Sequence, residues 1–318
     1  MTTQPAVQLG HHPPATHTVI HLSDTHFLGG GRPLYGAVDT DQGLGHALDA
    51  LAGSGRGIDA IVITGDLADL GEPDAYLRLR GLIDPVAAAL GAELVWVMGN
   101  HDERAPFAEQ LLGIEPSLEP LDRVHWAGGL RIIALDSTVP GYHHGDLDEG
   151  QLAWLRAELA TPAPDGTLLA LHHPPLPSPV ELMAVLELHG QDALAETLRG
   201  SDVRAILAGH LHHATFGGFA GIPVSVASAT CYTIDAAADY GSLRGMDGGR
   251  SFSLVELRPT GVTHTVVPVD TAETVSGFPK EALAHLAGLS PEQRIEAFSR
   301  KQSEHNQAEV ASSDARDL

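Results

Sequence analysis

The chain has few of the residues that mark several large classes of protein. Among 318 residues there is one cysteine, Cys231, so no disulfide can form within the chain, and such usage is typical of a reducing compartment. Lysine and arginine number 18 against 41 aspartates and glutamates, which gives a net charge of −23. Binding to nucleic acid or to an anionic membrane surface depends on cationic side chains, so this composition argues against both partners. A small anion that is bound through metal ions is still compatible with it.

Long hydrophobic runs are also missing. No apolar stretch approaches the roughly 18 residues that a membrane-spanning helix requires. Residues 1–17 are rich in threonine, proline and histidine and lack the apolar segment of a signal peptide. We therefore expect a cytoplasmic protein without an integral membrane segment, and a flexible N-terminal arm over residues 1–17.

What the chain does contain is a series of short apolar runs separated by amphipathic segments. Strands are predicted at 18–23, 60–64, 95–98, 124–127, 131–135, 167–171 and 203–208, and helices at 40–51, 72–90, from about 149 to 159, and at 192–199. Strands that alternate with helices are typical of parallel βαβ units and predict an α/β fold. Asp148, with Gln151 three residues later, predicts a capping box at the start of the third helix.

The later part of the chain has a different pattern of predicted secondary structure. Short β segments between residues 215 and 269 predict a second sheet, mainly antiparallel, packed on the first. We divide the chain into an arm (1–17), a single domain (18–278), and a C-terminal helical extension that ends in a polar, disordered tail (279–318).

Side chains that can bind metal follow five of the predicted strands. They are Asp24 and His26, then Asp66, Asn100 with His101, His172, and His210 with His212. Each taken alone has an ordinary explanation, because Asp, Asn and His are common in turns and caps. Taken together they indicate one site, because open α/β sheets gather the carboxyl ends of their strands at one edge.

The donor types narrow the choice of metal. Imidazole nitrogens with carboxylate and amide oxygens, and no thiolate, favour Mn, Fe or Zn. The number of donors fits two ions. Two ions about 3.5 to 4 Å apart can bind a phosphate, generate hydroxide at neutral pH and stabilise the charge of an in-line displacement.

At this point the sequence resembles a known family. The segments Asp24-x-His26, Gly65-Asp66, Gly99-Asn100-His101-Asp102, His172 and Gly209-His210-x-His212 are similar to the signature of the calcineurin-like metallophosphoesterases, in the same order. Within that superfamily the chain is most similar to the bacterial class III cyclic nucleotide phosphodiesterases, such as mycobacterial cyclic AMP phosphodiesterase. The resemblance implies a four-layer αββα sandwich of two mixed β-sheets flanked by helices, with a dinuclear metal site at the strand carboxyl ends. It also implies a homodimer.

The resemblance further implies how the ligands divide. Asp24, His26 and His212 would bind one ion, Asn100, His172 and His210 would bind the other, and Asp66 would bridge them. Iron and manganese are the expected metals, with zinc as the alternative. His173, beside a ligand, is interpreted as a turn residue.

Two residues are implied in the chemistry besides the ligands. His101 would donate to the phosphate or protonate the departing oxygen, and Asp69 would be its carboxylate partner. Asp102 receives no catalytic role. Asn100, His101 and His212 would also contact the substrate, and His143 lies on a loop that could reach the substrate or a dimer partner.

The implied reaction is attack of a metal-bridging hydroxide on a nucleoside 3′,5′-cyclic phosphate, such as cyclic AMP or cyclic GMP, to give the 5′-monophosphate. 2′,3′-Cyclic nucleotides and aryl phosphodiesters are further expected substrates. Three alternatives stay open: a phosphomonoesterase, a nucleotide pyrophosphatase, or a metal-binding scaffold that has lost catalysis. The sequence leaves open which metals are native, and whether the C-terminal tail places the protein at the periphery of the cell envelope.

Overall fold

The computed structural model describes residues 8–270, 273–275, 277 and 280–303. The chain divides into two compact units, of which the larger is Ala15–Thr271 and the smaller joins Met1–Pro14 with Ala272–Leu318. The larger unit contains every predicted site residue. No helix among the described residues has the length and apolarity to span a bilayer.

The first sheet has five strands in the order β13-β12-β1-β2-β3. They are β1 (His17–Leu22), β2 (Ala60–Thr64), β3 (Glu93–Val97), β12 (Ser251–Arg258) and β13 (Gly261–Pro268). Strands β1, β2 and β3 run parallel, whereas β12 and β13 add an antiparallel hairpin to the free edge of β1. The carboxyl ends of the three parallel strands therefore lie along one edge.

The second sheet has six strands in the order β4-β5-β6-β7-β9-β8. They are β4 (Arg123–Ala127), β5 (Leu130–Ala134), β6 (Thr167–Ala170), β7 (Val203–Ala208), β8 (Thr215–Phe219) and β9 (Ile222–Val226). The central strands β5, β6, β7 and β9 are parallel, and the outer strands β4 and β8 are antiparallel to their neighbours. A separate pair is formed by β10 (Thr233–Ile234) and β11 (Gly245–Met246).

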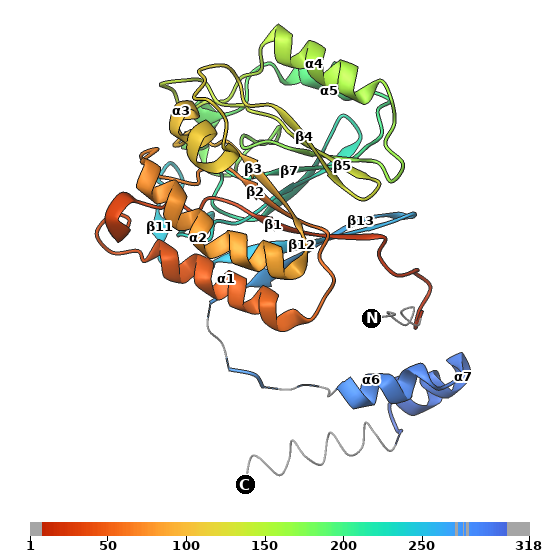
Figure 1. The fold of residues 1–318 in the computed structure, drawn as a ribbon. Coiled ribbons are helices and arrows are strands. Elements are labelled where there is room, and N and C mark those ends of the chain that lie inside the picture. Colours follow the sequence, from red (N-terminus) through yellow and green to blue (C-terminus); the bar gives the residue numbers. More distant parts are fainter. Residues whose placement is uncertain (1–7, 271–272, 276, 278–279, 304–318) are drawn as a thin grey trace. The chain divides into compact units, whose positions relative to one another are not determined.

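Helices cover the outer face of each sheet (Figure 1). In the larger unit they are α1 (Thr40–Ser54), α2 (Pro73–Leu90), α3 (Arg104–Phe107), α4 (Glu149–Leu159) and α5 (Gln191–Leu198), with 3₁₀ turns η1 (Gly29–Gly31) and η3 (Glu181–Leu186) and a π-helical turn η2 (Ala108–Leu112). Local sequence explains their limits. Helix α2 begins at Pro73 and ends at Gly91, which is left-handed. Asp148 and Gln151 form the predicted capping box of α4.

Three apolar cores separate four layers. One core lies between the first sheet and helices α1 and α2, and a second lies between the second sheet and helices α4 and α5. The third joins the inner faces of both sheets, with Val62 and Val97 from one and Ile132 and Leu207 from the other. Both faces of the central strands are buried, which is why these strands are continuous apolar runs in the sequence. The predicted four-layer αββα architecture is confirmed.

Two expectations about the sheets were wrong. Residues 215–269 do not form a sheet of their own, because β8 and β9 extend the second sheet while β12 and β13 extend the first. The five metal-binding strand ends do not come from one sheet either: β1, β2 and β3 belong to the first, and β6 and β7 to the second. A strand buried on both faces carries the same apolar pattern in either sheet, so the pattern could not assign it.

The smaller unit contains α6 (Lys280–Ala287), α7 (Pro291–Arg294) and the π-helical turn η4 (Ile295–Ser299). These helices lie within the predicted C-terminal extension, residues 279–318. Ser290 caps α7 in a capping box with Gln293. The predicted disorder over 304–318 and the first seven residues of the predicted arm lie outside the described residues.

Candidate metal centre

The predicted site residues meet where the carboxyl ends of the central strands of both sheets come together. Asp24 and His26 follow β1, Asp66 follows β2, Asn100 and His101 follow β3, His172 follows β6, and His210 and His212 follow β7. All of them are buried except Asn100 and His101, which are partly exposed. An edge of this kind is where α/β sheets bind ligands.

The backbone at this edge is unusual. Seven described residues other than glycine have a positive φ, and five of them are Asp24, His26, Asp66, His210 and His212. Such a conformation costs an L-residue on the order of 1 to 3 kcal/mol and concentrates at functional sites. Asp and His are residue types enriched at positive φ, but the sequence does not single out these positions, because the residues are spaced like ordinary turn residues.

Two glycines allow the strand ends to approach one another closely. A Cβ at Gly99 would lie 2.0 Å from the backbone nitrogen of Asp66. A Cβ at Gly209 would lie 1.9 Å from the Ser23 hydroxyl oxygen. Both distances are far below any real contact, so a side chain at either position would push apart loops that carry metal-binding residues. This explains why glycine precedes Asn100 and His210.

The first group of possible ligands is Asp24, His26, Asp66 and His212, whose ligand atoms all lie within 4.8 Å of one another. The Nε2 atoms of His26 and His212 are 3.1 Å apart. His212 Nε2 is 3.4 Å from a carboxylate oxygen of Asp24, and His26 Nε2 is 3.4 Å from Oδ2 of Asp66. Four donors thus converge on one small, buried space.

The second group centres on His172. Its Nε2 is 3.1 Å from Oδ1 of Asn100 and 3.3 Å from Oδ2 of Asp66. The ring of His210 lies 5.1 Å from that of His172, centroid to centroid. Oδ2 of Asp66 therefore lies within 3.4 Å of one histidine from each group. A carboxylate in this position is placed to bridge two cations.

Outer hydrogen bonds orient the histidines of the first group. Nδ1 of His26 donates to the Asp69 carboxylate over 2.9 Å, and Nδ1 of His212 donates to the Tyr232 carbonyl over 3.0 Å. With Nδ1 protonated, the lone pair of each ring is on Nε2, which faces the other donors. Partners of this kind fix the tautomer of metal-binding histidines.

The histidines of the second group follow the same rule. Nδ1 of His172 donates to the Thr64 carbonyl over 2.6 Å, so its lone pair is on Nε2. His210 has the opposite orientation. Its Nε2 donates a hydrogen bond to the Leu186 carbonyl over 3.1 Å, so its Nδ1 carries the lone pair that can bind a metal ion. The residues present therefore fit two transition metal cations in both donor type and orientation.

The protonation states of the buried aspartate and histidines depend on one another. Burial opposes ionisation of Asp66, yet His172 holds the pKa of Asp66 well below its usual value. Burial also opposes a charge on His172, yet Asp66 raises the pKa of His172 to about 9. Burial, together with His172, lowers the pKa of His210 to about 3. Metal ligands have to be deprotonated, so a bound cation would replace the proton on His172 as the counter-charge to Asp66.

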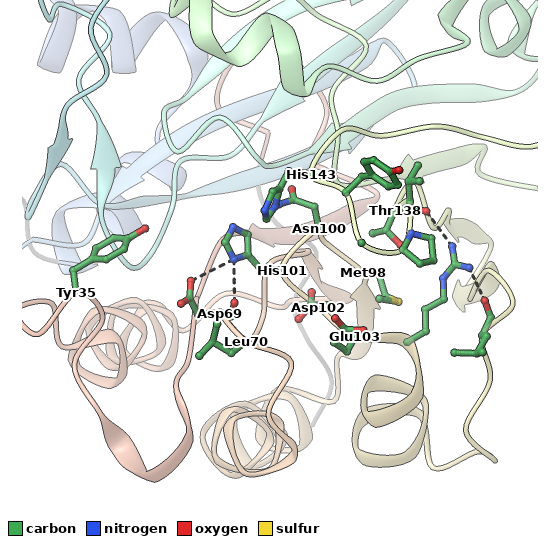
Figure 2. A pocket seen from close by; sticks show the side chains of 16 residues that line it. Tyr35, Asp69, Leu70, Met98, Asn100, His101, Asp102, Glu103, Thr138 and His143 are labelled. Carbon is green, nitrogen blue, oxygen red and sulfur yellow. Dashed lines mark hydrogen bonds and ion pairs between the residues drawn. The ribbon is translucent and has the colours of Figure 1, made fainter.

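His101 lies beside the two groups, with 30% of its side chain exposed. Its Nδ1 is 3.0 Å from the Asp69 carbonyl oxygen and 3.4 Å from the Asp69 carboxylate, as drawn in Figure 2. The nearer partner of that carboxylate is His26, at 2.9 Å. His26, Asp69 and His101 also satisfy the distances of a third possible metal group, but the two imidazoles face Asp69 with Nδ1 as hydrogen-bond donors. Asp69 thus fixes both rings.

His143 reaches the edge of the site. Its Nδ1 is 2.9 Å from the Asn100 amide nitrogen, and its ring centroid is 5.0 Å from that of His101. The loop that carries it therefore lies over the face of the site on which a substrate would bind.

His173 is close to His172 and His210 but is engaged elsewhere. Its Nδ1 accepts from the Ser137 hydroxyl over 2.8 Å, and its Nε2 donates to the His143 carbonyl over 3.2 Å. Both ring nitrogens are used, which favours the prediction that His173 is no ligand. Cys231, which sequence reasoning did not place near the site, has its sulfur 3.9 Å from Nδ1 of His212.

Asp102 has a structural task that sequence reasoning missed. Its buried carboxylate accepts from the backbone nitrogens of Leu67, Ala68 and Gly99 and from the Tyr76 hydroxyl, at 2.9 to 3.1 Å. It therefore ties the turn after β2 to the turn after β3, and those turns carry Asp66 and Asn100. The motif offered no signal for this, because an aspartate after a histidine in a turn is equally consistent with solvent exposure.

We expect Asp102→Asn to lower the free energy of unfolding by about 3 kcal/mol, because one amide atom becomes a donor that faces backbone N–H groups. Denaturant titration of the metal-free protein measures this. Asp49→Asn, on the exposed side of α1, is the matched control. A variant as stable as the parent would show that Asp102 does not hold the two turns together.

Comparisons with known proteins agree with this geometry. A family model described as calcineurin-like phosphoesterase matches residues 17–214. A cAMP/cGMP dual specificity phosphodiesterase of Mycobacterium tuberculosis is 58% identical over 267 residues, 84% of either chain. A probable cyclic nucleotide phosphodiesterase of Rhodococcus erythropolis is 50% identical over 87% of this chain and 91% of its own. Among solved structures, a dimetal phosphatase of Danio rerio has a TM-score of 0.58 at 14% identity, covers 80% of this chain and 97% of its own, and shows the same fold.

Proposed function

Because the chain belongs to the calcineurin-like phosphoesterase family, we propose that it hydrolyses nucleoside 3′,5′-cyclic phosphates to 5′-monophosphates with the help of two metal ions. The observation that carries the proposal is the position of Asp66, whose Oδ2 lies 3.4 Å from His26 and 3.3 Å from His172. The names of the Mycobacterium and Rhodococcus relatives support cyclic nucleotides as the substrate class.

We propose that the metal ligands form two sets. Asp24, His26 and His212 would hold one ion, Asn100, His172 and His210 the other, and Asp66 both. Bound there, two ions would supply a hydroxide at neutral pH and would neutralise charge on the phosphate. Iron and manganese suit these nitrogen and oxygen donors, with zinc as the alternative, and metal analysis of protein purified without added metal distinguishes them.

His101 would provide the proton that the departing oxygen needs. Asp69 accepts from Nδ1 of His101, so the proton that can be delivered is on Nε2, the atom turned away from Asp69. A positioned imidazole of this kind typically contributes about 10²- to 10⁴-fold to the rate. Asn100, His143 and His212 complete the set of residues that we expect to contact the substrate.

A panel of phosphate esters tests the activity. We expect cyclic AMP, cyclic GMP, 2′,3′-cyclic AMP and bis(p-nitrophenyl) phosphate all to be cleaved at least about tenfold faster, in kcat/KM, than p-nitrophenyl phosphate, since a dianionic monoester meets the added repulsion of a strongly acidic protein. The products of the cyclic nucleotides, separated by chromatography, should be nucleoside monophosphates. If the aryl monoester is the best substrate, the chain is a phosphomonoesterase instead.

Two features of the proposal concern the protein as a whole. We propose a homodimer in the cytoplasm, with the C-terminal extension as the segment that could bring it to the cell envelope. Sedimentation at several concentrations tests the dimer, and fractionation of cells with and without residues 279–318 tests the location. A monomer in sedimentation would contradict the proposed dimer, and a cellular distribution that the truncation leaves unchanged would contradict the role of the extension. Neither result would bear on the proposed reaction.

A further inference from the structure

A pocket of about 500 Å³ opens directly beside the metal centre (Figure 2). It begins at Asn100, His101 and His143 and continues between the turn at Leu70 and the loop from Thr138 to His143. Its volume falls within the roughly 300 to 1,000 Å³ that is usual for small-molecule sites. None of the metal ligands other than Asn100 lines it, so the pocket is an extension of the site and not the metal cavity itself.

The pocket presents apolar side chains to solvent. Leu70 is 60% exposed and Leu118 is 79% exposed, and Tyr142 on the opposite loop is 61% exposed. Met98 adds a buried apolar surface between them. Exposed leucines and a tyrosine grouped around one hollow are typical of a surface that receives a flat, apolar ring face.

A buried ion pair holds these walls in place. Arg104 donates to Asp136 over 3.0 Å, to the Leu118 carbonyl over 2.7 Å and to the Thr138 carbonyl over 3.0 Å. Arg104 and Asp136 are both buried. The guanidinium thus joins the segment at Leu118 to the loop at Thr138, and its charge is already compensated. It is not available to bind an anionic part of a ligand.

One charged group in the pocket lacks a protein partner. Glu103 is exposed and lines the pocket, and its methylene groups pack at Gly71. Within the described parts of the chain, no hydrogen bond or ion pair engages its carboxylate; its backbone nitrogen bonds the Tyr76 hydroxyl, and its backbone carbonyl accepts from the Phe107 nitrogen. A carboxylate accepts hydrogen bonds and donates none. A ligand group beside it should therefore carry hydrogen-bond donors and no negative charge, which a neutral group with N–H donors satisfies.

The direction of the reaction places the nucleoside on this side. His101 is the proposed donor to the leaving oxygen, and it lines the pocket. In a 3′,5′-cyclic phosphate the leaving oxygen and the retained oxygen belong to the same ribose. The ribose and its base must therefore extend past His101, away from the metal ligands.

We propose that this pocket holds the nucleobase of the substrate, and that the Glu103 carboxylate accepts hydrogen bonds from N–H groups on the base edge. The inference rests on the proposed hydrolysis of cyclic nucleotides and names the residue that reads the base. Adenine offers its amino group and guanine offers N1–H and an amino group, so one carboxylate accommodates both. A second phosphate in place of the base would meet Glu103 and Asp69, and among the described residues that line the pocket the one arginine, Arg104, is already paired with Asp136, which disfavours nucleotide pyrophosphates as substrates.

The test compares two substrates that differ by a single amino group: cyclic AMP and purine riboside 3′,5′-cyclic phosphate. Steady-state kcat and KM are measured on the metal-loaded full chain for the parent, Glu103→Ala, Glu103→Gln and the control Glu109→Ala, an exposed glutamate outside the pocket. For the parent, KM for the purine riboside analogue should be about tenfold higher than for cyclic AMP, the effect of one hydrogen bond to a charged group.

In Glu103→Ala, KM for cyclic AMP should rise to about that of the analogue, while kcat stays within about twofold, because the lost contact is made equally before and during the reaction. Glu103→Gln keeps one acceptor oxygen and should lose less. Glu109→Ala should match the parent.

Two results would overturn the inference while leaving the reaction intact. One is a parent enzyme that does not distinguish the two cyclic phosphates, and the other is a Glu103→Ala variant whose KM rises equally for both. Failure of the proposed reaction is visible in the parent alone, as cleavage of p-nitrophenyl phosphate without cleavage of either cyclic phosphate, and it overturns the inference as well.

Discussion

Asp66→Asn should lose about a thousandfold in kcat on cyclic AMP and should bind fewer than two metal ions per chain. The parent carboxylate has Oδ2 within 3.4 Å of His26 and within 3.3 Å of His172. The amide has the same shape but no charge, so it can no longer neutralise two cations at once. A thousandfold corresponds to about 4 kcal/mol, which is a typical cost when charge stabilisation at a reacting centre is lost.

Metal analysis by mass spectrometry and steady-state kinetics, made on the same preparation, measure both effects. The backbone should be undisturbed, because Oδ1 of Asp66 accepts from the His101 backbone nitrogen over 2.8 Å, and an asparagine oxygen can do the same. Asp84→Asn, at a partly exposed position of α2 that pairs with Arg80 and lies outside both ligand groups, is the control and should behave as the parent. Two bound ions and full activity in Asp66→Asn would remove the bridging role.

His101→Ala should lower kcat on cyclic AMP by about 10²- to 10³-fold with metal content close to that of the parent. Its ring is oriented by Asp69 and is not a member of either proposed ligand set. The loss should depend on the leaving group. An alkoxide such as the ribose 3′-oxygen needs a proton, whereas p-nitrophenolate leaves without one, so bis(p-nitrophenyl) phosphate should lose about tenfold at most.

The two substrates separate the possible roles of His101. Equal losses on cyclic AMP and on the aryl diester would mean that His101 binds the phosphate rather than protonating the leaving oxygen. Loss of metal in the variant would mean that His101 is a ligand, in which case the third possible metal group, His26 with Asp69 and His101, would have to be reconsidered.

The sequence was most informative at the strand ends. Runs such as Ile61-Val62-Ile63 are too short for helices and too apolar for surface strands, so their nature and their limits followed from composition. Each run stops at a polar group, and the sheet edge explains why groups far apart in the sequence, such as Asp24, Asp66 and His172, should meet. Helix caps were equally accessible, since Asp148 and Gln151 act within one turn of chain.

Contacts between residues far apart in the sequence could not be predicted, because the local pattern does not identify the partner. Which sheet a strand joins depends on a partner elsewhere in the chain, so β12 and β13 were assigned to the wrong one. The histidines are oriented by the backbone carbonyls of Thr64, Leu186 and Tyr232. Every residue has a backbone carbonyl, so residue type gives no indication of these contacts. Positive φ at His26 and His212 could not be predicted from residue type, because even histidine and aspartate, which are enriched there, adopt negative φ at most positions.

The pocket beside His101 combines both kinds of information. The sequence suggested His143 because its loop could reach the site, but Leu118 and Glu103 carry no pattern of their own. They come together because Arg104 joins two loops through their carbonyls and through Asp136. Recognition of the base was therefore invisible in the sequence even where the metal ligands were plain.

The proposed hydrolysis of a cyclic nucleotide requires both metal ions, held by two ligand groups that share Asp66. The most direct measurement is the rate of cyclic AMP hydrolysis as a chelator-stripped protein is titrated with manganese, with bound metal counted at each point. Activity should appear only as the second ion binds, reach its maximum at two ions per chain, and yield 5′-AMP. Full activity at one ion or none would contradict that requirement.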